Sequence, residues 1–260
     1  SHGRLRPGVD LFGRASRGHI WNPIVFDFLL KVYHYLLKVP KNCKMTIFLK
    51  IWLAIFSVLA TVAYADNSWT WPQVGSDIDG EAAGDQSGWS VSMSSDGTRV
   101  AIGARGNEGA SSDAGHVRVY EESGGTWTQV GSDIDGEAAG DESGSSVSMS
   151  SDGTRVAIGA RHNDGNGTWA GHMRVYMESG GTWAQVGSDI DGEAAGDQSG
   201  WSVSMSSDGT RVAIGARAND GTGSNAGHVR VYMESGGMWT QVGDDIDGEA
   251  TNDYSGNSVS

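Results

Sequence analysis

Residues 79–93 read Asp-Gly-Glu-Ala-Ala-Gly-Asp-Gln-Ser-Gly-Trp-Ser-Val-Ser-Met, and nearly the same letters return at 135–149 and 191–205, a period of 56 residues. The units that contain this stretch run 71–126, 127–182 and 183–238, with a truncated fourth at 239–260. A fixed period of this length predicts a repeat protein, in which each unit packs against its neighbours.

Each unit contains four strand-like runs, which in the first unit are 88–94, 98–104, 115–121 and 126–132. Apolar Trp89, Val91 and Met93 alternate with serines, as in a half-buried strand. Asp96-Gly97 between the first two runs predicts a hairpin turn with positive φ at both residues. Four antiparallel strands per unit predict an all-β fold, an array of β-propeller blades that is incomplete at three blades and part of a fourth.

The four-stranded blade also predicts where the other repeated features of each unit lie. The acid-rich segment 78–88 is expected to carry the chain from the outer strand of one blade to the inner strand of the next, along one rim. A tryptophan recurs at the start of every unit and is expected in the blade core. This series comprises Trp71, Trp127, Trp183 and Trp239.

Composition divides the chain at residue 65. The following residues, 66–260, contain no Lys, Leu, Phe or Cys, but hold all except two of the 32 Asp and Glu and 36 of the 40 Gly. Good helix formers are therefore scarce, which favours short strands and turns. The formal net charge of the whole chain is −14, and this acidity argues against nucleic acid or an anionic membrane surface as partner.

Residues 45–65 are typical of a secretory signal peptide. Lys44 and Lys50 flank its start, an apolar run follows from Ile51, and Ala63-Tyr64-Ala65 forms a small-residue cleavage site before Asp66. The run 51–65 is shorter than the roughly 20 residues that span a bilayer, so an uncleaved membrane anchor is the weaker reading. Cleavage between Ala65 and Asp66 predicts a secreted or cell-surface chain without a membrane span.

Residues 1–44 precede this signal and admit two readings. The segment can be upstream translation that is not part of the native protein, because a signal peptide normally begins the chain. It can also be an amphipathic helix, because apolar residues recur at helical spacing between Pro23 and Pro40. The predicted domain order is therefore a helical leader and signal segment, followed by the β-repeats of 66–260.

The repeated unit resembles the FG-GAP repeat family, best known from the propeller of integrin α-chains. The resemblance rests on the stretch 79–93 with its copies and on Val-Ala-Ile-Gly-Ala-Arg at 100–105, 156–161 and 212–217. It covers 71–260 and is closest to the variant common in secreted and surface proteins of microbes and algae. Two departures stand out, since Ser87-Gly88 replaces Phe-Gly and Gly103-Ala104-Arg105 replaces Gly-Ala-Pro. The resemblance implies an extracellular propeller.

FG-GAP propellers often bind Ca²⁺ in an Asp-rich hairpin after the first strand, and the resemblance raises that expectation here. The corresponding positions in this chain hold Ser92, Ser94 and Asp96, with Val100 in place of the last carboxylate. One carboxylate is too few for a Ca²⁺ site. The hairpin is therefore expected to be a structural turn.

A second acidic set lies in the segment that begins each unit, and two readings of it stay open. Alternate carboxylates could converge on Ca²⁺ or another hard cation, or they could form a solvated acidic rim. Asp85 could also cap the inter-blade turn by accepting backbone N–H groups. The candidate metal ligands are Asp77, Asp79, Glu81, Asp85, Asp133, Asp135, Glu137, Asp141, Asp189, Asp191, Glu193 and Asp197, with Asp245, Asp247, Glu249 and Asp253 in the truncated unit.

Other polar residues recur once per unit. His116, His172 and His228 fall in separate blades, so packing or hydrogen bonding is expected of them rather than metal binding. Asn166-Gly167-Thr168 is an N-glycosylation sequon in a predicted surface loop. No unique constellation of nucleophile, base and oxyanion donor can be assembled, so catalysis is not expected.

The sequence thus predicts a binding or adhesion module without catalysis of its own, which contacts an extracellular protein or glycan. Loops 106–114, 162–170 and 218–226 differ among units while the strands scarcely change, and they are the expected contact surface. Two alternatives stay open, an acidic wall-associated protein that collects cations and a fragment of a propeller enzyme whose site lies beyond Ser260. Open blade edges would favour self-association.

Overall fold

The computed structural model describes residue 31 and residues 72–260. The leader and signal expected over 1–65, with the Ala65–Asp66 cleavage site and Trp71, therefore lie outside the described residues apart from Lys31. Residues 72–260 form three antiparallel sheets and contain no helix. The strands are β1 (Ser87–Met93), β2 (Arg99–Ala104), β3 (His116–Ser123), β4 (Thr126–Gln129), β5 (Ile134–Asp135), β6 (Ser146–Met149), β7 (Arg155–Ala160), β8 (His172–Ser179), β9 (Thr182–Gln185), β10 (Ile190–Asp191), β11 (Ser199–Met205), β12 (Arg211–Ala216), β13 (His228–Ser235), β14 (Met238–Gln241) and β15 (Ile246–Asp247).

Each sheet has five strands in four positions, which follow the chain order β1-β2-β3-β4 in the first sheet, as the repeat predicts. The fourth position is divided, because β4 pairs with the second half of β3 and the two-residue β5 pairs with its first half. Gly131, with φ of 74°, lies between the two pieces. The strand expected over 126–132 is therefore interrupted after Gln129, and the acid-rich segment expected as a plain connection adds its first residues to the sheet.

The hairpin between β1 and β2 differs from the expected two-residue turn. The Gly97 N–H donates to the Ser94 carbonyl (3.0 Å), and the Ser94 N–H donates to the Arg99 carbonyl (2.9 Å). Gly97 has a φ of 76°, whereas Asp96 is not in the positive region. The prediction of positive φ at Asp96 is wrong because four residues, rather than two, separate the paired ends, and such loops contain an ordinary turn.

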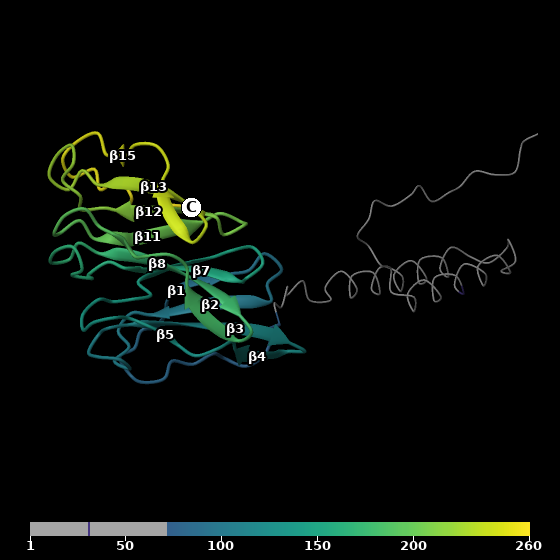
Figure 1. The fold of residues 1–260 in the computed structure, drawn as a ribbon. Helices are drawn as coiled ribbons and strands as arrows, with labels where there is room; N and C mark the ends of the chain where they lie inside the picture. Colours follow the sequence, from purple (N-terminus) through teal and green to yellow (C-terminus); the bar gives the residue numbers. More distant parts are fainter. Residues whose placement is uncertain (1–30, 32–71) are drawn as a thin grey trace, which may run out of the picture. The chain divides into compact units, whose positions relative to one another are not determined.

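Neighbouring sheets stack face to face, with the first at the bottom and the third at the top of Figure 1. One core lies between the first and second sheets and another between the second and third. In the first core, Ala101, Val117, Val119 and Ile134 meet Met149, Val156 and Ile158. Each apolar face is thus shielded from solvent only where another unit covers it.

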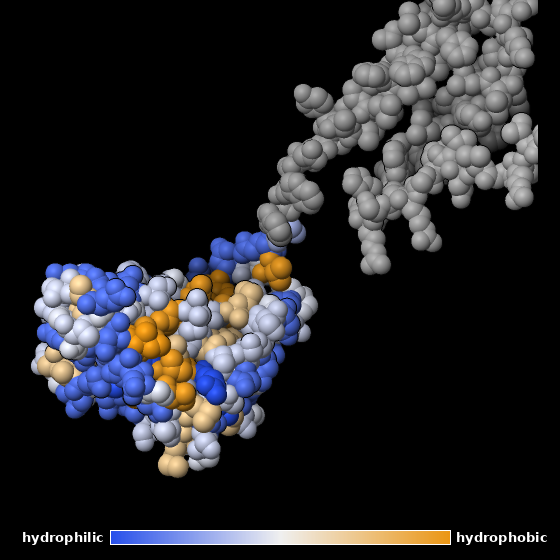
Figure 2. Space-filling view, turned by 90° about the horizontal axis from the view of Figure 1, so that it is seen from above, coloured by the Kyte–Doolittle hydropathy of each residue, from blue (hydrophilic) through white to orange (hydrophobic). Residues whose placement is uncertain are grey.

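The outer faces of the first and third sheets show what the stacking contributes. Val91 is 62% exposed and Met93 is 54% exposed in β1, while the equivalent Val203 and Met205 of β11 are 8% and 9% exposed. On the last sheet Ile246 is exposed, although its equivalents Ile134 and Ile190 are buried. Seen from above this sheet, apolar side chains run across the surface between hydrophilic ones (Figure 2).

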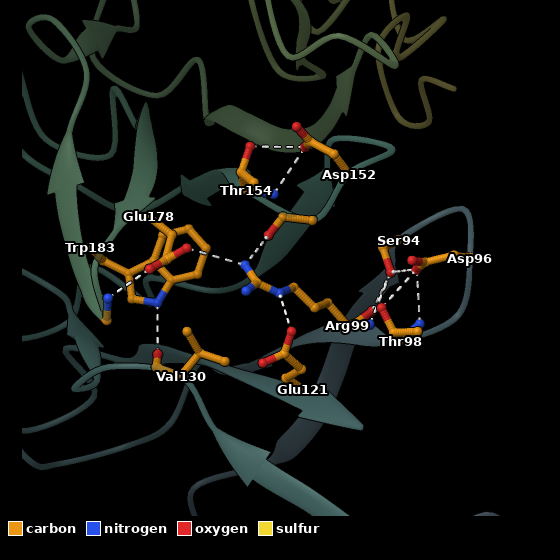
Figure 3. Close-up of polar contacts among 12 residues, drawn as sticks. Ser94, Asp96, Thr98, Arg99, Glu121, Val130, Asp152, Thr154, Glu178 and Trp183 are labelled. Carbon is orange, nitrogen blue, oxygen red and sulfur yellow. Dashed lines mark hydrogen bonds and ion pairs between the residues drawn. The ribbon is translucent and has the colours of Figure 1, made fainter. Parts of the chain in front are cut away.

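Arginine and glutamate connect successive sheets. The Arg99 guanidinium pairs with Glu121 of its own sheet (3.2 Å) and with Glu178 of the next (3.4 Å), and it donates to the Gly153 carbonyl (3.3 Å), as Figure 3 shows in part. A Cβ on Gly153 would lie 2.7 Å from Arg99 Cδ, so the residue must be glycine for the arginine to cross. Arg155 repeats the two contacts to the next sheet, with Gly209 and Glu234, while Met177 takes the place of Glu121.

The tryptophans at the start of the units also connect sheets, and their placement corrects the expectation of a core position. Trp127, Trp183 and Trp239 lie half-buried in the outer strands. Trp183 packs against the core between the first and second sheets, and Trp239 packs against the core between the second and third. Each indole N–H donates to a backbone carbonyl 53 residues earlier in the chain, as from Trp183 to Val130 (2.8 Å, Figure 3). The polar N–H edge of the indole ring explains why the side chain lies at the margin of the core and not inside it.

The contrast between β1 and β11 yields a test of the stacking. Met205→Ala should lower the free energy of unfolding of the full chain by about 2–5 kcal/mol, because it opens a cavity between sheets. Met93→Ala should cost less than about 1 kcal/mol, because this side chain is already in water. Urea unfolding of both variants measures the difference. Equal losses would mean that the β1 face is covered in solution.

Candidate functional site

The acid-rich segments and the variable loops meet at one edge of the sheets, where the second strand ends and the third begins. We call this edge the rim, and define it as residues 79–89 and 105–115 with their repeats. The Gly106 N–H donates to the Asp85 carbonyl (3.1 Å), and the Gly140 N–H donates to the Ser112 carbonyl (2.9 Å). Each variable loop is thus held between its own acidic segment and that of the next unit.

Asp85 has the capping role that its position suggested. Its carboxylate is buried and accepts hydrogen bonds from the Ala82 N–H (2.9 Å) and the Asn107 side-chain amide (3.1 Å). Asp141 and Asp197 make the same two contacts in their units. These carboxylates hold the rim together and are occupied by protein donors.

The other predicted carboxylates do not converge within one segment. Glu81 instead meets Asp133, the counterpart of Asp77 in the following segment, and both face His116 at the start of β3. The three resulting groups, which we call the Glu–His–Asp clusters, are Glu81–His116–Asp133, Glu137–His172–Asp189 and Glu193–His228–Asp245.

In the first cluster, His116 Nδ1 lies 3.8 Å from Glu81 Oε2 and 3.7 Å from Asp133 Oδ2. These separations are too long for good hydrogen bonds. The histidine side chain is 1% exposed, against 45% for Glu81 and 29% for Asp133. Neither ring nitrogen of His116 or His228 has a hydrogen-bond partner within the described part of the chain.

Burial also governs the charge of His172 and His228. It lowers the pKa of His172 to about 4, and the nearby Arg174 guanidinium acts in the same direction. Burial likewise lowers the pKa of His228. A neutral imidazole near pH 7 keeps a lone pair, which is the form in which histidine binds metals.

The clusters were not foreseen, although two of their three residue types were candidates. The histidines do lie in separate sheets, which is why convergence was not expected. Each one nevertheless meets carboxylates from two successive acidic segments, because β5 pairs with the start of β3 and brings Asp133 next to His116. The available signal was that both segments flank the histidine at a constant spacing in every unit.

The hairpin that binds Ca²⁺ in related propellers does not fit that ion here. Asp96 Oδ1 accepts hydrogen bonds from the Ser94 hydroxyl (2.7 Å), the Thr98 N–H (3.0 Å) and the Thr98 hydroxyl (2.9 Å), as Figure 3 shows. Val100 is buried in the sheet. The Ser92 hydroxyl accepts a hydrogen bond from the Met149 N–H (3.0 Å) in the next sheet. This hairpin is a structural turn.

Planar side chains gather near the rim. The Arg105 guanidinium lies 3.4 Å from the ring centre of Trp89, which is 52% exposed. Trp201, the counterpart of Trp89, has Arg161 at 4.4 Å and Arg217 at 3.5 Å. Stacked guanidinium and indole groups attract each other and hold flat surfaces in place.

The middle unit is built differently, since Ser145 stands where the others have tryptophan. Glu142 instead forms ion pairs with both neighbouring guanidiniums, at 3.1 Å from Arg105 and 2.6 Å from Arg161. Its aromatic surface comes from Trp169, which is 53% exposed and stacks on His162 at 5.3 Å. The His162 side chain is 22% exposed, and its Nδ1 lies 3.4 Å from Glu142 Oε1.

Asn166 is exposed in the variable loop of the middle unit, as its sequon predicted. Its side-chain amide donates to the carbonyls of Gly192 (2.8 Å) and Glu193 (3.2 Å). The nitrogen that would carry a glycan therefore binds the neighbouring acidic segment.

Comparison with known proteins agrees with the repeat pattern. The FG-GAP repeat family matches residues 77–120 and 189–232, which lie in the first and third units. Among curated proteins none matches the chain. Within the described residues, no helix is long and apolar enough to cross a membrane.

Several solved structures resemble the chain in part. They include a putative 6-phosphogluconolactonase from Bacteroides uniformis (14% identity, TM-score 0.41, covering 60% of this chain and 39% of that chain). Kuenenia stuttgartiensis hydrazine synthase (12%, 0.40, 70% and 42%) and Saccharomyces cerevisiae Sqt1 (15%, 0.40, 62% and 36%) are further examples. The chain spans about two fifths of the length of these proteins.

The lowered pKa values of the hairpin aspartates predict that the folded chain loses stability in acid. Hydrogen bonds from Thr98 and Ser94 hold the pKa of Asp96 at about 2, below its ordinary 3.8, and those from Ser206 and Thr210 hold the pKa of Asp208 at about 2. Because the folded pKa is lowered, their stabilisation is present above pH 4 and is lost as the pH falls from about 4 to about 2.

Urea unfolding of the full chain at several pH values measures this effect. The double variant Asp96→Asn/Asp208→Asn should show a shallower fall of stability between pH 4 and 2 than the parent chain. Asp244→Asn is the matched control, because Asp244 is exposed and has no hydrogen bond within residues 72–260. An unchanged slope in the double variant would contradict the prediction.

Proposed function

We propose that residues 66–260 act as a propeller-type binding module that is secreted or displayed at the cell surface. In this proposal the rim contacts an extracellular protein or glycan, and the module has no catalysis of its own. The FG-GAP repeats favour a propeller-type binding role. The signal-like segment 45–65 supports the location.

The observation that carries the proposal is the set of exposed planar side chains near the rim. Trp89 and Trp169 are each more than half exposed, although tryptophan is usually well buried. Trp and Arg are the residues that most often dominate binding energy in interfaces. Contacts with neighbouring arginines hold Trp89 and Trp201 in place, so less ordering entropy is lost when a ligand binds.

Differences among units support the same surface. Most strand positions are the same in the three sheets, whereas position 89 and its counterparts 145 and 201 carry tryptophan, serine and tryptophan, and the loops 106–114, 162–170 and 218–226 differ. The loop tryptophan at 169 occurs in the middle unit alone among the three. A constant scaffold with a varied rim is the usual arrangement of a recognition surface.

The test is the double variant Trp89→Ser/Trp201→Ser in the full chain. The serine is taken from position 145 of the same protein, so the fold should tolerate it. Binding to a glycan array, to cells and to extracellular-matrix proteins should weaken at least tenfold relative to the parent chain, because two stacking platforms are removed.

Met238→Thr is the matched control. Met238 is an exposed apolar residue of β14, and the equivalent residues of the other units are Thr126 and Thr182. This variant should bind as the parent chain does. Unchanged binding by the tryptophan variant, or an equal loss in the control, would reject the rim as the contact surface.

A further inference from the structure

We infer that each Glu–His–Asp cluster binds one divalent transition-metal ion, with zinc as the best fit. The ligands would be the histidine Nδ1 and one oxygen from each carboxylate, with water completing the coordination. This inference is independent of the proposed role of the rim tryptophans.

The first support is the buried histidine itself. His116 and His228 are 1% exposed and have no hydrogen bond at either ring nitrogen. Buried polar atoms nearly always have a partner. In both residues Nδ1 points to two carboxylate oxygens that are too far away to be that partner. A metal ion between them would satisfy all three groups.

The separations match the spacing of ligands around such an ion. Ligands at about 2.0–2.2 Å from a tetrahedral centre lie about 3.3–3.6 Å from one another. From the histidine Nδ1 to the Asp oxygen the three clusters measure 3.7, 3.6 and 3.5 Å, and to the Glu oxygen 3.8, 3.9 and 3.8 Å. Small side-chain adjustments would therefore bring the ligands into place.

The second oxygen of each carboxylate is already held by the protein. Asp133 Oδ1 accepts a hydrogen bond from the Gln129 amide (2.6 Å), which leaves Oδ2 facing His116. Glu81 Oε1 lies 3.7 Å from the Arg118 guanidinium, and Oε2, which faces His116, accepts one long hydrogen bond from the Asn107 amide (3.4 Å). The other two clusters repeat the Gln–Asp and Arg–Glu contacts. Such outer partners orient metal ligands in known sites.

The mixture of ligands determines the class of ion. One imidazole nitrogen with two carboxylate oxygens suits zinc and similar ions. Ca²⁺ needs six to eight oxygen ligands, which the cluster does not offer. Glu81 and Asp133 are partly exposed, so an ion can enter from solvent without unfolding the sheet.

The test is equilibrium dialysis of the full chain against ZnCl₂, with bound metal measured by mass spectrometry. His172→Phe should release one ion relative to the parent chain, and the triple variant His116→Phe/His172→Phe/His228→Phe should release three. Phenylalanine fills the same buried space, so the β-sheet circular dichroism should persist. Because the number of bound ions in each variant is compared with that in the parent chain, any metal bound by His and Cys residues in 1–65 is the same in both and cancels.

Two matched variants separate the cluster from other effects. His162→Phe changes a rim histidine outside the clusters and should keep every ion. Glu137→Gln keeps the histidine but removes a ligand charge, and should weaken zinc binding at the middle cluster at least tenfold. Cobalt loaded in place of zinc should give the visible absorption of a tetrahedral centre, which is lost in the triple variant.

Three results would overturn the inference. They are the absence of zinc binding to the parent chain at 100 µM free metal, the same number of bound ions in the triple variant, and binding of CaCl₂ as tight as that of ZnCl₂ at these clusters.

Discussion

The face-to-face stacking of two-sided apolar sheets is the constraint on which the rest of the structure depends. Val117 and Val119 of β3 lie on the same strand face and are fully buried by the next sheet, and Tyr120, on the opposite face, is also buried. A single four-stranded sheet with two such faces cannot be stable in water. The contacts between units are therefore as much a part of the fold as the strands themselves.

This stacking explains the glycines that define the repeat. A Cβ on Gly103 of β2 would overlap the Gly144 carbonyl of the next unit, and one on Gly115 would overlap the backbone of Ser143. Ser90 closes the same contact by donating to the Gly144 carbonyl (2.7 Å). The Ser-Gly and Ile-Gly-Ala stretches recur because backbones meet there without room for a side chain.

Sequence reasoning recovered what is local to one unit. The period, the four strands and the capping role of Asp85 follow from alternation and spacing. It did not recover what depends on two segments meeting, such as the break after Gln129, the path of Arg99 to Glu178, or the approach of Asp133 to His116. Spacing along one chain shows which residues share a face, but which faces meet depends on packing between sheets.

The contacts between units have a consequence for how the chain can change length. Arg99 reaches the second sheet as Arg155 reaches the third, and Trp183 binds Val130 as Trp239 binds Val186. Every such contact joins direct neighbours and repeats in the same form. Unequal recombination that inserts or deletes one whole 56-residue unit would preserve these contacts at the new junction. The number of units can therefore change in single steps while these contacts between neighbours keep the same form.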